Sequence, residues 1–192
     1  MKIDKGQIIS LILVLIVILL FFTPVGTKLK ATIDLHTLPN PQLKSNTEVK
    51  LFPSEDWQVQ LKAYNGFQDI QLEEFKGEVV FINFWGTWCG PCVAEMPALQ
   101  KLYEAKGENV NFAFIAMMDK PEKINSFLKK TGYTIPIYEA NSKFSKEIHP
   151  LSFPTTYILN KKGEILFFER GAVNWDAPEI HQLLDKLIAE SD

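Results

Sequence analysis

An apolar run near the start of the chain is its most regular pattern. Fourteen of the fifteen residues from Ile8 to Phe22 are apolar, and no charged side chain occurs between Lys5 and Lys28. As a helix that rises about 1.5 Å per residue, the 22 uncharged residues 6–27 would be roughly 33 Å long, close to the thickness of the hydrocarbon layer of a bilayer. The pattern therefore predicts a transmembrane helix.

Two other interpretations of this run are weaker. A cleaved signal peptide has a shorter apolar run followed by small residues, whereas residues 23–28 are Thr-Pro-Val-Gly-Thr-Lys. A soluble core helix would show a polar face. Two lysines precede the run and two follow it, so the flanking charges do not indicate its orientation. We expect a short N-terminal tail over residues 1–7, a transmembrane anchor over 8–26, a tether over 27–47 and one folded domain over 48–192.

The folded domain alternates strand and helix patterns. Apolar and polar residues alternate from Trp57 to Tyr64, and Asn65-Gly66 is a hairpin-turn signal before a second short strand at residues 67–72. Continuous apolar runs predict two buried strands, and two shorter strand patterns follow near the end of the chain. These four segments are residues 79–85, 110–117, 155–159 and 164–168.

Three helices are expected between and after these strands. The second begins near Pro121 and ends at Gly132, and the third follows a capping box of Asp176 and Glu179, with Trp175 packed as a hydrophobic staple. The order of elements indicates an α/β fold with a central mixed β-sheet flanked by helices. The first helix carries an apolar stripe on Cys92, Met96, Leu99 and Tyr103.

Composition agrees with one globular domain and excludes several classes of protein. Of the 192 residues, 46% are hydrophobic, which is enough for a core and argues against disorder. Twenty basic and 23 acidic side chains give a formal charge of −3, so we expect no nucleic-acid partner. Two cysteines are too few for a scaffold held by several disulfides.

Metal ligands are scarce in this sequence. A zinc site on both cysteines would need two further ligands from three histidines without paired spacing, His36, His149 and His181. The adjacent Met117 and Met118 end a predicted strand and are expected in the core rather than at a copper ion. We therefore expect no metal and no other cofactor.

Both cysteines lie in one motif, Trp88-Cys89-Gly90-Pro91-Cys92, after a predicted buried strand and at the start of a predicted helix. A thiolate is the nucleophile in disulfide exchange, and the positive end of a helix dipole stabilises it. Pro91 suits a first helical turn because it has no amide hydrogen, and Gly90 permits a tight entry. The alternatives at this point are a pair of structural thiols or half of a metal site.

The sequence around the cysteines resembles a known family. Residues 80–97, Val-Phe-Ile-Asn-Phe-Trp-Gly-Thr-Trp-Cys-Gly-Pro-Cys-Val-Ala-Glu-Met-Pro, are similar to the membrane-anchored thioredoxin-like proteins of the TlpA/ResA family. The resemblance extends from Trp57 to the C-terminus, about 70% of the chain, and residues 153–156, Phe-Pro-Thr-Thr, resemble the second motif of the family. It implies a thioredoxin-like fold with a cis proline at Pro154 beside the cysteines, here with an added N-terminal β-hairpin.

Two residues separate this chain from cytoplasmic thioredoxin and are typical of the TlpA/ResA group. Asn83, six residues before Cys89, stands where thioredoxin has a buried acid used in proton transfer. Glu95, three residues after Cys92, stands where thioredoxin has an apolar residue.

Glu95 is expected to handle protons. At i+3 from Cys92 it shares a helix face with that residue, with Cβ atoms about 5–6 Å apart, and Cys92 must lose a proton when it attacks a mixed disulfide. That face should point toward the core, so we expect the carboxyl to be desolvated and its pKa raised. The alternative is a solvated glutamate on the helix surface.

The resemblance implies a thiol–disulfide oxidoreductase. Cys89 would attack a substrate disulfide, and Cys92 would then resolve the mixed disulfide, leaving a Cys89–Cys92 bond. The residues expected to contact the substrate are Trp88, Gly90, Pro91, Phe153 and Pro154.

The resemblance also implies partners and a location. The substrates would be protein thiols or disulfides, with the haem-site thiols of apocytochrome c as a candidate, and a membrane thiol-transfer protein would donate electrons. The domain would act as a monomeric reductant on the periplasmic side of the cytoplasmic membrane. Two alternatives stay open, a Cu(I) chaperone that uses both thiols as ligands and a non-catalytic interaction domain on the same fold.

Overall fold

The structure, a computed structural model, describes residues 5–22, 38–42 and 50–190. The chain divides into two units, residues 1–37 and residues 38–192. Part of the predicted tail and most of the predicted tether lie outside the described residues. Residues 38–42 of the predicted tether belong to the second unit, where the backbone N–H of Asn174 donates to the carbonyl of Pro39 at 2.9 Å.

In the first unit, helix α1 runs from Lys5 to Phe22 and has 18 residues. Apolar side chains such as Leu11 and Leu15 are exposed on it. Residues 23–26 of the predicted anchor are not described. Across the described ranges, we find no helix that is both long enough and apolar enough to cross a membrane.

The described part of the second unit is built on an eight-stranded sheet in the order β1-β8-β7-β4-β5-β6-β2-β3. Strands β4, β5 and β6 are parallel, and the other pairings are antiparallel, so the sheet is mixed as predicted. The strands are β1 (Lys50–Leu51), β2 (Gln60–Ala63), β3 (Ile70–Gln71), β4 (Val80–Trp85), β5 (Asn111–Ala116), β6 (Ile137–Ala140), β7 (Thr155–Leu159) and β8 (Glu164–Arg170). The helices are η1 (Asp56–Gln58), η2 (Leu72–Phe75), α3 (Gly90–Lys106), α4 (Pro121–Thr131) and α5 (Pro178–Ala189).

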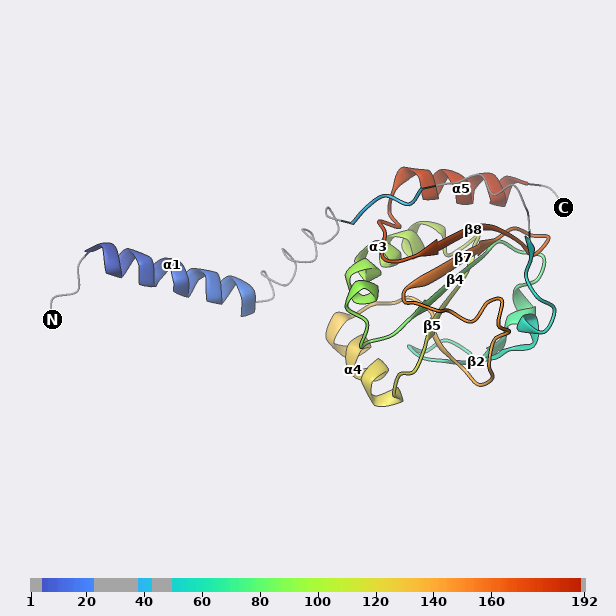
Figure 1. The fold of residues 1–192 in the computed structure, drawn as a ribbon, viewed down its shortest axis with the longest axis horizontal. Helices are drawn as coiled ribbons and strands as arrows, with labels where there is room; N and C mark the ends of the chain where they lie inside the picture. The colour runs from blue at the N-terminus through green and yellow to red at the C-terminus, as the bar shows by residue number, and fades with distance from the viewer. Residues whose placement is uncertain (1–4, 23–37, 43–49, 191–192) are drawn as a thin grey trace. The chain divides into compact units, whose positions relative to one another are not determined.

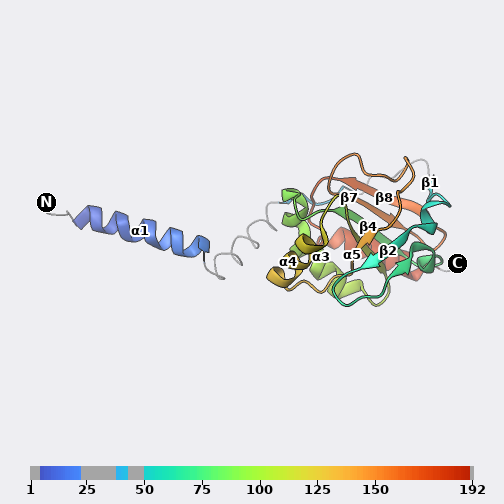
Figure 2. The ribbon, with the colours of Figure 1, turned by 90° about the horizontal axis from the view of Figure 1, so that it is seen from below.

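Helices α3 and α4 cover the same face of this sheet (Figures 1 and 2). The connections β4–α3–β5 and β5–α4–β6 join parallel strands and step in the same direction, so right-handed crossovers place both helices on one side. Aromatic contacts agree with this. Tyr103 of α3 packs on Phe112 with ring centroids 5.5 Å apart, and Phe127 of α4 packs on Trp85 at 5.2 Å.

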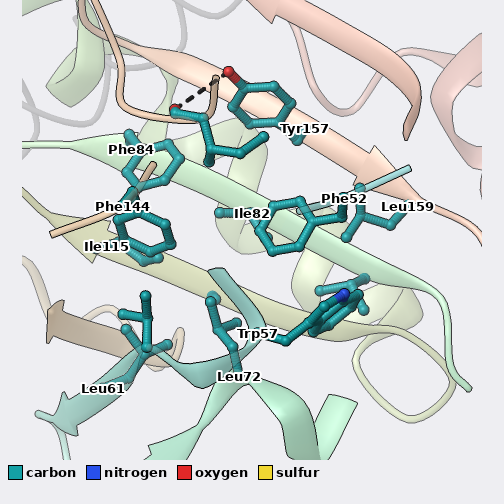
Figure 3. Close-up of a cluster of buried hydrophobic side chains, with 14 of the residues drawn as sticks. Phe52, Trp57, Leu61, Leu72, Ile82, Phe84, Ile115, Phe144, Tyr157 and Leu159 are labelled. Atoms are coloured by element: carbon teal, nitrogen blue, oxygen red, sulfur yellow. Dashed lines mark hydrogen bonds between the residues drawn. The ribbon is translucent and has the colours of Figure 1, made fainter. Parts of the chain in front are cut away.

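The opposite face carries a large hydrophobic cluster (Figure 3). The N-terminal elements and the segment around Phe144 cover it, and Val80, Ile82 and Phe84 of β4 belong to it. Because successive side chains of a strand point to opposite faces, Asn83 lies on the helix-covered face.

The first predicted strand is shorter in the structure. Trp57 lies in η1 and is buried, and β2 begins only at Gln60. Asn65 and Gly66 have positive φ values of 62° and 81°, as a type I′ turn requires. The β2–β3 ladder comprises two residue pairs that end at Leu61 and Ile70. Lys62 and Ala63 of β2 pair with β6 instead, so the two strands are joined by a longer connection than the turn signal implies.

The ends of the last two helices show where local signals hold. Helix α4 ends at Gly132, whose φ of 72° suits glycine, as predicted. The predicted capping box of α5 is wrong, because Ala177 occupies the N-cap. One carboxylate oxygen of Asp176 instead lies 3.1 Å from Nε2 of His181, and the other lies 3.2 Å from Nζ of Lys101. Lys101 belongs to α3, so the local sequence around Asp176 does not predict this contact.

The predicted apolar stripe of α3 supplies a test of the core: Cys92, Met96 and Leu99 are fully buried, and Tyr103 is partly buried. Leu99→Ala removes a side chain with no exposed surface, so we expect the free energy of unfolding to fall by about 2–5 kcal/mol. The same change at Leu151, which is 82% exposed, should alter it by less than about 0.5 kcal/mol. Urea unfolding of both variants and the unmodified chain, followed by tryptophan fluorescence, checks this. Equal losses at the two positions would contradict the packing of α3.

Candidate active site

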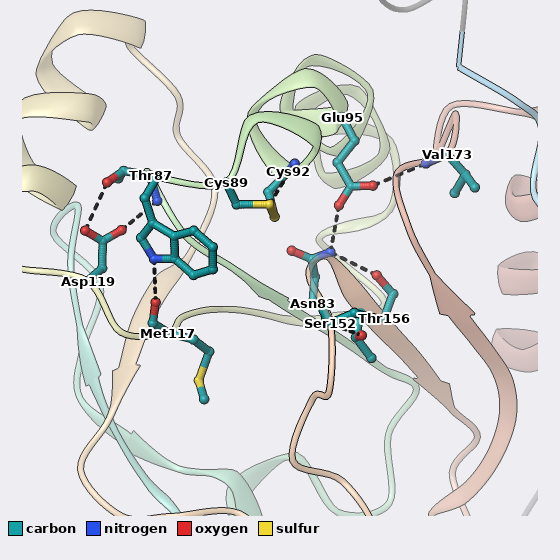
Figure 4. Close-up of a disulfide and its surroundings, with 12 residues drawn as sticks. Asn83, Thr87, Cys89, Cys92, Glu95, Met117, Asp119, Ser152, Thr156 and Val173 are labelled. Atoms are coloured by element: carbon teal, nitrogen blue, oxygen red, sulfur yellow. Dashed lines mark hydrogen bonds between the residues drawn. A yellow bond between two sulfur atoms is a disulfide. The ribbon is translucent and has the colours of Figure 1, made fainter.

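The two cysteines lie where β4 leads into α3. Cys89 is the N-cap of α3 with an extended backbone, and its sulfur accepts a hydrogen bond from the backbone N–H of Cys92 at 3.2 Å. The two sulfurs form a disulfide (Figure 4). Cys92 is fully buried, whereas 5% of Cys89 is exposed. An approaching protein can therefore reach Cys89 more readily than Cys92.

The turn after β5 holds the loop that precedes Cys89. The backbone N–H and hydroxyl of Thr87 donate to the carboxylate of Asp119 at 2.6 and 2.9 Å, and the indole of Trp88 donates to the carbonyl of Met117 at 3.0 Å. Met118, expected in the core, is 75% exposed and has a φ of 51°. The prediction is wrong for Met118, where the chain turns outward, whereas Met117 is partly buried against the hydrophobic cluster.

The two sequence motifs lie side by side in the structure. The peptide bond between Phe153 and Pro154 is cis, and the ring of Phe153 meets Trp88 edge-on with centroids 5.3 Å apart. Trp88 is about half exposed, Gly90 and Pro91 are exposed, and Pro154 is buried. The predicted substrate-contacting residues thus gather around Cys89, although their contact with a substrate stays a prediction.

Glu95 projects from α3 into the interior and is fully buried. In the described part of the chain, its carboxylate accepts hydrogen bonds from the indole of Trp175 at 2.8 Å, the side-chain amide of Asn83 at 3.0 Å and the backbone N–H of Val173 at 3.3 Å. Burial raises the pKa of Glu95 from 4.5 to about 8, against the lowering effect of these donors and with a smaller contribution from the charge of Glu169. The carboxyl group is therefore desolvated as the sequence predicts, and it can exchange a proton near neutral pH.

Asn83 lies between Glu95 and the strand that follows the cis proline. Its amide nitrogen donates to Glu95 and, at 2.9 Å, to the hydroxyl of Thr156 on β7. Among the described residues, its carbonyl oxygen is buried without a hydrogen-bond partner. Figure 4 shows this oxygen on the side of the disulfide and the nitrogen on the side of Glu95.

Several residues of this site carry no signal in the local sequence. Trp175 has the spacing of a hydrophobic staple, but its indole donates to Glu95, 80 residues earlier in the chain. Val173 and Asp119 also carried no local signal, because each acts through a contact with a distant segment. Thr156 lies in the second motif, so its position near the site could be expected from that motif.

The histidines named for a metal alternative are dispersed. His149 is exposed on the segment before the cis proline, His181 pairs with Asp176, and His36 lies outside the described residues. Within the described ranges, we find no cluster of three or more His, Cys, Asp or Glu side chains placed to hold a metal ion.

The fold and the site define a class of protein. A cysteine pair at the start of a helix, a cis proline in the neighbouring motif and a mixed sheet beneath are the features of a thioredoxin-like fold. The chain matches the Redoxin family over residues 41–186, so it belongs to that family and, within it, to the thioredoxin-like TlpA/ResA group.

Individual relatives show how far the similarity extends. The thioredoxin-like protein YneN of Bacillus subtilis is 34% identical over 128 residues, which cover 65% of this chain and 74% of YneN. The thiol-disulfide oxidoreductase ResA of Oceanobacillus iheyensis is 33% identical over 112 residues, covering 57% of this chain but only 58% of ResA. The solved structure of StoA from Bacillus subtilis has a TM-score of 0.52 and 28% identity, and the match covers 74% of this chain and 98% of that structure.

The raised pKa of Glu95 makes stability depend on pH. Its pKa is about 8 in the folded chain and 4.5 as a free side chain, so the folded state binds the proton more tightly. This contribution to stability is fully present below about pH 4.5 and is lost as pH rises through 8, at roughly 1.4 kcal/mol per pH unit between those values.

Glu95→Gln, which stays neutral, should remove this slope whatever its own baseline stability. The exposed Glu104 on the same helix gives the matched control, since Glu104→Gln should leave the slope intact. Urea unfolding of the disulfide form between pH 4 and 9 measures the slopes. An unchanged slope in Glu95→Gln would mean that Glu95 does not titrate in this range.

Proposed function

We propose that this protein is a thiol–disulfide oxidoreductase that acts on disulfides of other proteins. The observation that carries the proposal is the Cys89–Cys92 disulfide at the start of α3, with one sulfur near the surface and the other buried. The intact cysteine pair and the similarity to ResA, a protein named a thiol-disulfide oxidoreductase, support catalysis over a purely structural pair.

The reaction follows from the positions of the two sulfurs. In the reduced protein, the Cys89 thiolate attacks one sulfur of a substrate disulfide, and the other substrate sulfur leaves as a thiolate that takes up a proton. Cys92 then loses its proton and attacks Cys89, which releases the second substrate thiolate and forms the Cys89–Cys92 bond. Two electrons pass to the substrate, so a donor dithiol must restore the reduced protein.

The local structure suits these steps. The start of α3 stabilises negative charge on Cys89, and the backbone N–H of Cys92 points at its sulfur. Cys92 is fully buried, so its sulfur attacks the mixed disulfide at Cys89 from the interior side. Glu95, one helical turn further, is the acid–base group that accepts the proton of Cys92.

The surroundings of Cys89 suit an unfolded or extended polypeptide. Trp88, Met118 and Leu151 are large apolar side chains that are 51%, 75% and 82% exposed. Phe153 packs against Trp88, and the backbone around Pro154 is the surface against which the substrate chain pairs. Such exposed apolar side chains are typical of interaction sites.

We further propose that the domain works outside the cytoplasmic membrane, as a monomeric reductant tethered by its N-terminal segment. Residues 6–27 carry no charge, and helix α1 covers Lys5–Phe22, about 27 Å at 1.5 Å per residue. The uncharged stretch continues for five residues beyond that helix. In this setting, a membrane thiol-transfer protein supplies electrons, and the haem-site thiols of apocytochrome c are candidate substrates.

The two cysteines should behave differently when each is removed. Cys92→Ala leaves the attacking thiol without its resolving partner, so we expect covalent mixed disulfides to accumulate with substrate proteins. Cys89→Ala should accumulate none and should fail to reduce insulin disulfides. Non-reducing gels and mass spectrometry of the trapped species measure this.

The double variant Cys89→Ala/Cys92→Ala is the control for non-covalent association. Equal trapping by both single variants would reverse or remove the assigned roles. If the unmodified chain also fails to reduce insulin, a non-catalytic interaction domain becomes the better interpretation.

The proposed location has its own test. Alkaline phosphatase fused to the C-terminus should be active, because that enzyme needs disulfides that form outside the cytoplasm. A fluorescent protein that folds only in the cytoplasm should stay dark at the same position. Deletion of residues 1–30 should reverse both results. A dark phosphatase and a bright fluorescent fusion in the full chain would place the domain in the cytoplasm.

A further inference from the structure

The unpaired carbonyl oxygen of Asn83 is the least explained polar group of the site. Its amide nitrogen binds both Glu95 and Thr156, while the oxygen is buried without a partner among the described residues. A buried acceptor without a donor costs free energy, so such a group in the middle of a redox site calls for an explanation.

The oxidation state accounts for the missing donor. The sulfur of Cys92 carries no hydrogen in the disulfide, whereas the reduced residue has an S–H group, which is a weak donor. The Asn83 oxygen lies on the side of the disulfide (Figure 4), and Cys92 is fully buried there. Reduction therefore creates a donor on the side where the acceptor is unpaired.

The partners of Glu95 impose a second condition. The indole of Trp175 and the backbone N–H of Val173 can only donate, which satisfies an ionised carboxylate but not a protonated acid. Of the three partners, Asn83 alone can offer an acceptor. It does so if its side-chain amide rotates by half a turn, so that the oxygen takes the place of the nitrogen. The hydroxyl of Thr156 accepts from the nitrogen in one orientation and donates to the oxygen in the other, so it serves both.

We propose that Asn83 is a positioning residue whose amide orientation follows the transfer of one proton from Cys92 to Glu95. The inference rests on the proposed disulfide exchange. Before the transfer, the Cys92 thiol donates to the Asn83 oxygen, and the Asn83 nitrogen donates to the Glu95 carboxylate. After the transfer, the nitrogen faces the Cys92 thiolate and the oxygen accepts from the protonated Glu95.

This step balances without any change to Asn83 itself. One proton leaves the Cys92 sulfur and one arrives on the Glu95 carboxylate, and the electron pair left on the sulfur attacks the mixed disulfide at Cys89. Other charged groups act on the same carboxyl. Glu169 of β8 raises the proton affinity of Glu95, and Cys89, the N-cap of α3, becomes a second ionisable group when it is reduced.

The test compares the pKa of Glu95 in the disulfide and dithiol forms of the full chain. Carboxyl ¹³C NMR reads this pKa, with the signal assigned by Glu95→Gln. A thiol hydrogen bond that holds the Asn83 nitrogen toward Glu95 favours the carboxylate, so chemical reduction should lower the pKa of Glu95. We expect the lowering to be about 0.5–1 unit greater in the unmodified chain than in Asn83→Leu. Charge on reduced Cys89 acts in both proteins and cancels in this comparison.

Thr156→Val is the matched control, because Thr156 is buried, binds the same amide and supports both of its orientations. In Thr156→Val, reduction should change the pKa of Glu95 by as much as it does in the unmodified chain. A merely structural role for Asn83 would shift the pKa of Glu95 equally in both redox forms. The same redox-dependent change in Asn83→Leu and in the unmodified chain would overturn the proposal.

A second measurement needs no substitution and covers the case in which Asn83→Leu does not fold. In the reduced chain, the side-chain amide protons of Asn83 should show nuclear Overhauser contacts to Thr156 while Glu95 is ionised and to Cys92 once Glu95 is protonated. Contacts that stay unchanged through the titration would overturn the turning of the amide. Both measurements use chemical reduction and no turnover, so a failure of insulin reduction would count against the proposed function alone.

Discussion

Strand β4 is the constraint on which the site depends. It lies between β5 and β7 and pairs with both along most of its length, so its register is held from two sides. That register sends Ile82 and Phe84 into the hydrophobic cluster and leaves Asn83 on the face covered by α3. A slip of one residue would exchange these faces and would place an amide in the apolar cluster. The point at which β4 ends also decides where Cys89 starts the helix.

A buried acid can exist here because its donors come from separate parts of the fold. The hydrogen bonds to Glu95 arise from β4 and from the segment between β8 and α5. Desolvation disfavours the carboxylate and the donors favour it, so the two effects offset each other in part. Glu95 is consequently neither a permanent charge nor a permanently neutral group, which is the condition for exchanging a proton with a thiol.

The site places exposed apolar side chains outside a buried polar cluster. Next to Cys89, the half-exposed side chain of Trp88 packs against Phe153 and leaves apolar surface in contact with solvent. Beneath it, Cys92, Glu95 and Asn83 are sealed from solvent. Cys92 and Glu95 face the interior together because residues three positions apart lie on one face of a helix, whereas Trp88 precedes the helix and is about half exposed.

Much of the fold and part of the site could be predicted from the sequence alone. The strand at residues 155–159, the end of α4 at Gly132 and the position of the cysteine motif between β4 and α3 all follow from interactions within a few residues. The burial of Glu95 also follows from its spacing to Cys92 on one helix face. These features need only backbone preferences and periodicity, which a short stretch of sequence contains.

The tertiary structure decided the rest. It turned the predicted staple residue Trp175 into a hydrogen-bond donor to Glu95, it placed Trp57 in a helical turn rather than a strand, and it exposed Met118. Each of these outcomes depends on which strands are neighbours in the sheet. Contacts between residues tens of positions apart exist only once that order is set, and short-range patterns carry no information about it.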